Sequence, residues 1–99
     1  MSVDASFLAQ VKLALRISTN SFDSQISMLI EEAILDLEAS ADSKTIETST
    51  ADALQTGAII AYVSYKWYGM DVKYKAAYDD IKMKMATSSR YRAGVVADV

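Results

Sequence analysis

The stretch ALQTGAIIAYVSYKWYGM, residues 53–70, holds the only tryptophan of the chain and three of its six tyrosines. At about 100° per residue, Tyr65 lies on one face of a helix, whereas Ile60 and Trp67 point roughly the opposite way. A helix that is apolar nearly all round is buried on nearly all sides. The stretch therefore predicts a central helix, at about 50–69, in an all-α fold.

The rest of the chain shows the same helical period. Three further helices are expected at about residues 4–16, 24–41 and 71–86. The chain has no proline and three glycines, and strand-like alternation is not sustained. These features predict a small bundle of about four helices. The predicted helix caps, in chain order, are Asp4 or Ser6, Asp23 or Ser24, Ser49 or Thr50, and Asp71.

Apolar stripes indicate which faces of the outer helices meet the core. The expected core residues are Leu8, Val11, Ala14 and Leu15, then Ile26, Leu29, Ile30, Ala33 and Leu37, then Tyr74, Ala77, Tyr78, Ile81 and Met85. Met28 and Leu35 break the pattern, because they lie one heptad apart on the other side of their helix, with acids beside them. They are either scattered exposed apolar residues or the centre of a partner contact with a charged rim. We favour the contact slightly.

Two segments lack a helical period. Residues 41–50, ADSKTIETST, predict a mobile loop between helices. Residues 88–99 predict a mobile C-terminal tail that docks a partner, after a helical domain of residues 1–87.

The inventory of reactive groups is sparse. The chain has no histidine and no cysteine, which removes the commonest metal ligand, the side chain that titrates near neutral pH and the thiol nucleophile. The adjacent acids Glu31–Glu32 and Asp79–Asp80 diverge by about 100° on their helices and cannot act together on one atom. Glu32 and Asp36 could share a cation, but such a pair is far more often a solvated helix face. We therefore expect no enzyme, no cofactor and no metal site.

Nucleic-acid and membrane binding find little support. A single-strand binding surface needs several rings on one basic face, but the rings here diverge and only Lys66 lies among them. No apolar run approaches the roughly 18 residues of a membrane span, and the start MSVDASFLAQVK lacks the features of a signal peptide. The apolar surface that three neighbouring helices cannot cover instead predicts a contact with another subunit.

Charge divides the chain. Residues 1–52 carry nine acids against three bases, and residues 53–99 carry seven bases against four acids. Such charges most often solvate helix faces. The alternative is that complementary ends favour head-to-tail association of copies.

The chain runs in the order FLAQVKLALRI, a polar turn, FDSQISMLIEEAILDLEA, a polar loop and then ALQTGAIIAYVSYKWYGM. This order resembles the layout of the small head–tail connector proteins of tailed phages, also called head completion or adaptor proteins. The LRI turn, the aromatic Lys66-Trp67-Tyr68 and the closing SSRYR are similar to family motifs, over about residues 5–92. The chain departs from the pattern because it lacks the proline often found before the terminal YR and extends past it.

The resemblance implies a structural virion protein at the head–tail interface, assembled in the host cytoplasm. Its copies would form a ring, expected to be twelve-fold, beneath the portal protein and bind the next neck or tail component, a stopper or tail terminator. Double-stranded DNA would pass through the ring without sequence-specific binding, and no membrane would take part. The residues expected at subunit contacts are Ile60, Trp67, Tyr68, Met28 and Leu35, and those expected at the portal are Arg90, Tyr91 and Arg92.

A second hypothesis comes from another class of protein. A small helical regulator, such as an inhibitor or antitoxin-like module, would bind one protein partner. It predicts a dimer or a one-to-one complex instead of a ring.

Overall fold

The computed structural model describes residues 3–40 and 45–87, which form four α-helices and no strand. The helices are α1 (Ala5–Ala14), α2 (Asp23–Ser40), α3 (Ala53–Trp67) and α4 (Val72–Ala86). The all-α prediction and the number of helices are confirmed. The predicted tail, with Arg90, Tyr91 and Arg92, lies outside the described residues.

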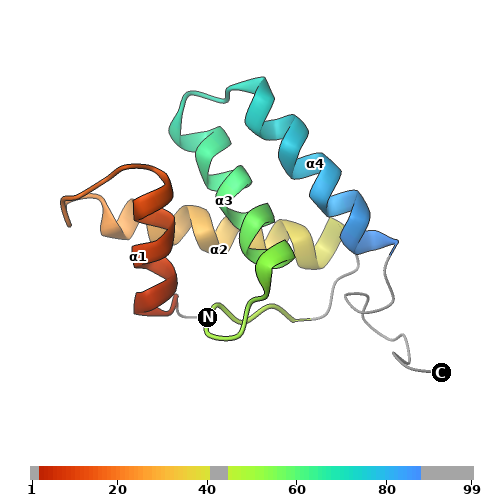
Figure 1. The fold of residues 1–99 in the computed structure, drawn as a ribbon, viewed down its shortest axis with the longest axis horizontal. Helices are drawn as coiled ribbons and strands as arrows, with labels where there is room; N and C mark the ends of the chain where they lie inside the picture. Colours follow the sequence, from red (N-terminus) through yellow and green to blue (C-terminus); the bar gives the residue numbers. More distant parts are fainter. Residues whose placement is uncertain (1–2, 41–44, 88–99) are drawn as a thin grey trace.

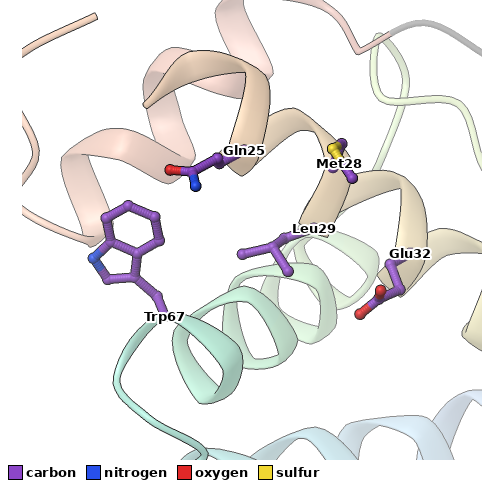
Figure 2. Close-up of a pocket in the computed structure, with 5 residues that line it drawn as sticks. All are labelled: Gln25, Met28, Leu29, Glu32 and Trp67. Carbon is purple, nitrogen blue, oxygen red and sulfur yellow. The ribbon is translucent and has the colours of Figure 1, made fainter. Parts of the chain in front are cut away.

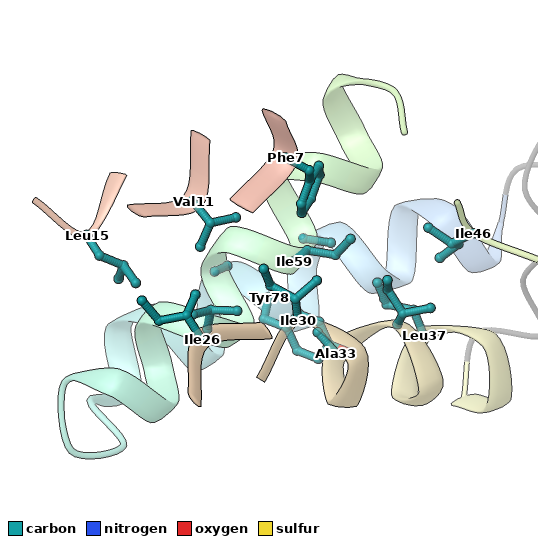
Figure 3. Packing of buried hydrophobic residues seen from close by; sticks show 14 of the residues in the cluster. Phe7, Val11, Leu15, Ile26, Ile30, Ala33, Leu37, Ile46, Ile59 and Tyr78 are labelled. Carbon is teal, nitrogen blue, oxygen red and sulfur yellow. The ribbon is translucent and has the colours of Figure 1, made fainter. Parts of the chain in front are cut away.

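The helices are arranged around α2 and α3. In Figure 1, α3 and α4 lie side by side as an antiparallel pair across α2, and α1 packs near the first half of α2. Apolar side chains from all four helices meet between them (Figure 3). The buried residues of this core are Phe7, Val11, Leu15, Ile26, Ile30, Ala33, Ile34, Leu37, Ile46, Ala58, Ile59, Ala61, Val63, Tyr78 and Met85.

The helical period of apolar residues predicted most of the core. The predicted and observed core residues differ at the edges of the apolar stripes. Ala14 and Ala77 are exposed, although both were expected inside. Phe7 and Ile34 are buried in addition to the predicted residues. The difference has a physical reason, because burying a large side chain removes more apolar area from water than burying an alanine. Burying Phe7 and Ile34 therefore contributes more to stability than burying Ala14 or Ala77 would.

Carboxylates cap α1 and α4 as predicted. Asp4 accepts hydrogen bonds from the backbone N–H groups of Ser6 and Phe7, at 3.1 and 3.3 Å. Asp71 accepts one from the N–H of Lys73 at 3.0 Å. These bonds satisfy backbone donors that have no partner within the helix.

The prediction for the start of α3 is wrong. Its cap is Asp52, not Ser49 or Thr50, and the helix begins three residues after Thr50. The Asp52 carboxylate accepts from the Gln55 N–H at 2.9 Å, and the Gln55 side chain accepts from the Asp52 N–H at 3.1 Å. This reciprocal pair satisfies two donors at once, which a lone serine or threonine cannot do.

α2 also begins differently from the prediction. Asp23 is its first residue, so neither Asp23 nor Ser24 precedes the helix. The Asp23 carboxylate instead lies 2.8 Å from the ammonium of Lys12 in α1. This ion pair ties the start of α2 to the end of α1.

α1 ends in a left-handed residue. Arg16 has φ 60°, its N–H donates to the carbonyl of Leu13, and the Ile17 N–H donates to the carbonyl of Lys12. These two bonds form a Schellman motif, in which glycine is the usual residue at the left-handed position. The chain therefore carries backbone strain at the LRI turn.

The polar stretch after α2 is anchored at its described end. Ile46 is fully buried, and its N–H donates to Glu38 at 2.8 Å. The Thr48 hydroxyl accepts from the Asp4 N–H at 2.7 Å. Residues 41–44 of the predicted mobile loop lie outside the described residues. Among residues 45–50, Ile46 belongs to the core, which was not predicted from the sequence.

Candidate protein-binding surface

A pocket of about 280 Å³ lies between the first half of α2 and the end of α3. Figure 2 shows its lining: Gln25, Met28, Leu29, Glu32 and Trp67. Leu29 is half-buried, although it was expected in the core. Met28 belongs to α2 and Trp67 to α3, and both were predicted at subunit contacts. The structure places them at the same pocket.

Trp67 is the last residue of α3 and is held in place on one side. Its ring meets the edge of the Phe22 ring, with centroids 5.4 Å apart and planes at 75°. Phe22 lies directly before α2 and is itself 40% exposed. Because one aromatic residue fixes the other, the tryptophan is presented to the pocket as a rigid apolar wall.

The α2 outer face consists of Met28, Glu31, Glu32 and Leu35. Met28 is 70% and Leu35 is 61% exposed. At 100° per residue, both lie on the side of α2 opposite the buried Ile30 and Leu37. Two large apolar side chains in water, flanked by carboxylates, match the centre and rim of a protein contact.

The Glu32 carboxylate at the rim of the pocket is held by two residues of α3. The Tyr62 hydroxyl donates to Glu32 at 2.5 Å, and the Lys66 ammonium lies 3.8 Å from the same carboxylate oxygen. Burial, followed by this hydrogen bond, raises the pKa of Tyr62 above its ordinary value. The tyrosine is therefore held as a protonated donor that orients Glu32.

A similar arrangement joins α4 to α2. The Tyr78 hydroxyl donates to Asp36, and Lys82 lies 3.3 Å from the same oxygen. The Tyr62 and Tyr78 rings meet edge to face at 5.1 Å. Burial raises the pKa of Tyr78, and the bond to Asp36 adds to the shift. The Asp36 carboxylate thus makes a structural contact that joins α2 to α4.

Two other residues predicted at subunit contacts have different surroundings. Ile60 is half-buried and packs against the core. Tyr68 is 45% exposed, stacks on Tyr74 at 5.5 Å and donates to the carbonyl of Leu15 at 3.1 Å. Tyr68 therefore stabilises the junction of α1, α3 and α4 and lies apart from the pocket lining.

A second exposed apolar surface lies on α4 and was not predicted from the sequence. The α4 outer face consists of Val72, Ala76 and Met83, which lie within about 40° of one another at 100° per residue. Val72 is 78% and Met83 is 68% exposed, and Ala76 is also exposed. The helical spacing of Val72, Ala76 and Met83 in the sequence could have indicated this face. The lysines and aspartates between them made the apolar pattern hard to recognise.

The polar side-chain groups of the described residues include carboxylates, amines and hydroxyls, and these residues include neither histidine nor cysteine. No group of three or more acidic, histidine or cysteine side chains among them is placed to hold a metal ion. Within residues 3–40 and 45–87, no helix is both long and apolar enough to cross a lipid bilayer. The surface features of the described residues are exposed apolar side chains with charged residues beside them.

No protein-family model, no curated protein and no solved structure matches the chain.

Proposed function

We propose that this chain is a structural subunit that works through protein contacts, and that it serves as a head–tail connector of a tailed phage. The observation that carries the proposal is the α2 outer face beside the Trp67 pocket, in a chain whose segments resemble the connector layout. Met28 and Leu35 expose large apolar side chains on a well-packed helix. Such exposure on a small protein favours a partner that covers it.

The resemblance supplies the rest of the proposal. Copies form a ring under the portal, lengthen the DNA channel and receive the next neck component. The net charge of −3 suits a wall past which DNA slides, because phosphate binding depends on cationic contacts. Arg90, Tyr91 and Arg92, outside the described residues, are the proposed portal contacts.

Co-expression with the cognate portal protein tests this function. We expect the two proteins to co-purify and electron microscopy to show a ring of this chain stacked on the portal. A chain truncated after Thr87 should lose portal binding while its circular dichroism stays helical. Failure to co-purify, with no ring at high concentration, would contradict the connector role.

The same preparation separates the connector from the regulator hypothesis. Light scattering of a regulator would show a dimer or a one-to-one complex. A closed ring of many copies would exclude that alternative.

A further inference from the structure

We propose that the α2 outer face of one copy packs against the α4 outer face of the next copy. The proposal rests on the connector function for the presence of several copies and adds the two surfaces that join them. Its evidence is the composition, charge and placement of the two faces.

The two faces are alike in their apolar content and spacing. Met28 and Leu35 are seven residues apart, a rise of about 10 Å along a helix. Ala76 and Met83 on α4 have the same separation. The small Ala76 leaves room for a large side chain from the facing helix, as knobs-into-holes packing requires.

The two faces differ in charge. α2 carries five acids and no base between Asp23 and Ser40, and lysines of the other helices pair with three of them, Asp23, Glu32 and Asp36. Glu31, on its outer face, has no ion-pair partner among the residues described. A contact of α2 with a second α2 would therefore place like charges together, which disfavours a symmetric dimer through this face.

α4 carries four lysines and two aspartates between Val72 and Ala86, so its net charge is positive, although Asp79 shares the face of Ala76 and Met83. Lys73 is exposed, and its ammonium lies over the Tyr74 ring at 5.1 Å. Lys84 pairs with Asp80 at 3.2 Å, but both side chains are more than 60% exposed. Such an exposed pair is weak in water, so Lys84 can turn to a carboxylate of the neighbour. α4 thus suits the acidic border of α2.

The positions of the two faces require two different copies. Within one chain, α2 and α4 meet through Tyr78 and Asp36 on their inner sides. Met83 lies on the opposite side of α4 from Tyr78, and Met28 lies on the opposite side of α2 from the core. The faces therefore point away from each other. A contact between unlike faces repeats from copy to copy, and it closes into a ring when the rotation allows.

Cysteine cross-linking tests the pairing directly, because the chain has no cysteine of its own. Met28→Cys and Leu35→Cys proteins are each mixed with Met83→Cys protein at high concentration under a mild oxidant. Facing helices bring at least one of these pairs within disulfide reach. We expect a mixed disulfide dimer from at least one mixture. The control is Leu13→Cys, since Leu13 is 79% exposed on α1 and lies outside both faces.

Mixed dimers that form no faster than with Leu13→Cys would overturn the pairing. Leu35→Cys protein that links mainly to itself would also overturn it, because that product requires α2 against α2. In sedimentation experiments, Met83→Lys should weaken self-association at least about tenfold, and Leu13→Lys should leave it unchanged.

Portal binding separates this proposal from the connector function. If Met83→Lys protein still forms a normal ring on the portal, the pairing is wrong and the connector role stands. If the specific cross-links form but the chain never binds a portal, the pairing stands and the connector role is wrong.

Discussion

The Tyr78 hydroxyl donates a hydrogen bond to Asp36 and thereby joins α4 to the middle of α2. Tyr62 makes the equivalent bond from α3 to Glu32, four residues earlier on α2. Both bonds need the protonated phenol, and both tyrosine pKa values are raised, first by burial and then by the bonded carboxylate. These two hydrogen bonds of α2 to the α3–α4 pair therefore depend on pH in the alkaline range.

We expect the free energy of unfolding to fall as the pH rises above about 10. An unfolded tyrosine ionises near pH 10, whereas Tyr62 and Tyr78 hold their protons to higher pH in the folded chain. The unfolded state then binds fewer protons than the folded state, so stability is lost with rising pH. Below the unfolded pKa this contribution is fully present.

Urea unfolding between pH 8 and 11 measures the effect. A Tyr62→Phe/Tyr78→Phe variant should be less stable at pH 8, by about 1 kcal/mol for each bond, but should lose less stability above pH 10. The lysines, which titrate in the same range, are common to both proteins. Equal slopes above pH 10 would contradict this prediction.

Ile46 should contribute to the free energy of unfolding as a core residue does. Its side chain is fully buried, although it belongs to a polar stretch. Ile46→Ala should lower the free energy of unfolding by about 2–5 kcal/mol, because it removes apolar burial and leaves a cavity. Thr45→Ala, at the exposed preceding residue, is the control and should change stability by less than about 0.5 kcal/mol. A loss below about 1 kcal/mol for Ile46→Ala would mean that the stretch is not anchored.

The capping box predicts which polar residue starts α3. Asp52→Ala should cost about 1 kcal/mol, because it leaves the Gln55 N–H without its acceptor. Ser49→Ala and Thr50→Ala, at the two caps expected from sequence, should each cost less than about 0.5 kcal/mol. Thermal unfolding of the three variants compares them directly. A larger loss for Thr50→Ala than for Asp52→Ala would reverse the assignment.

Arg16 and Gly69 both have a left-handed backbone just after a helix. Substitutions at the two positions should therefore change the free energy of unfolding in opposite directions. Arg16→Gly should stabilise the chain by about 0.5–1 kcal/mol, because glycine adopts φ 60° without the cost that a Cβ brings. Gly69 has φ 73°, and an added Cβ would meet nothing within 4 Å. Gly69→Ala should therefore destabilise by about 1 kcal/mol through the backbone alone.

Gly57 provides the matched control for these substitutions. It lies inside α3, and an added Cβ would meet only the Ile81 side chain at an ordinary 3.6 Å. Gly57→Ala should therefore stabilise by up to about 1 kcal/mol. Equal effects of Gly57→Ala and Gly69→Ala in urea unfolding would contradict the role of φ.

The helices could be predicted because their stripes and caps are local features of the sequence. The Asp4 and Asp71 caps and the exposure of Met28 and Leu35 followed from spacing alone. Ile46 could not be found in this way, because its burial depends on α2 and on contacts distant in the chain. The pocket was not predicted: Met28 and Trp67 were identified separately as contact residues, and only the packed helices place them at one pocket.

Trp67 should report whether the pocket is covered on association. It is the only tryptophan of the chain, and it lines the pocket with Met28 at the edge of the α2 outer face. A partner that covers this surface removes water from the indole. Its emission should therefore move to shorter wavelengths as the concentration rises from dilute monomer to assembly.

The concentration at which the emission shifts should match the midpoint of self-association from sedimentation. Met28→Lys should keep the helical circular dichroism and the monomer spectrum but move both midpoints to higher concentration, because a charge replaces apolar contact. Leu13→Lys should leave them in place. A wild-type spectrum that stays constant through assembly would show that the Trp67 pocket remains uncovered, and the contact would then have to exclude Met28.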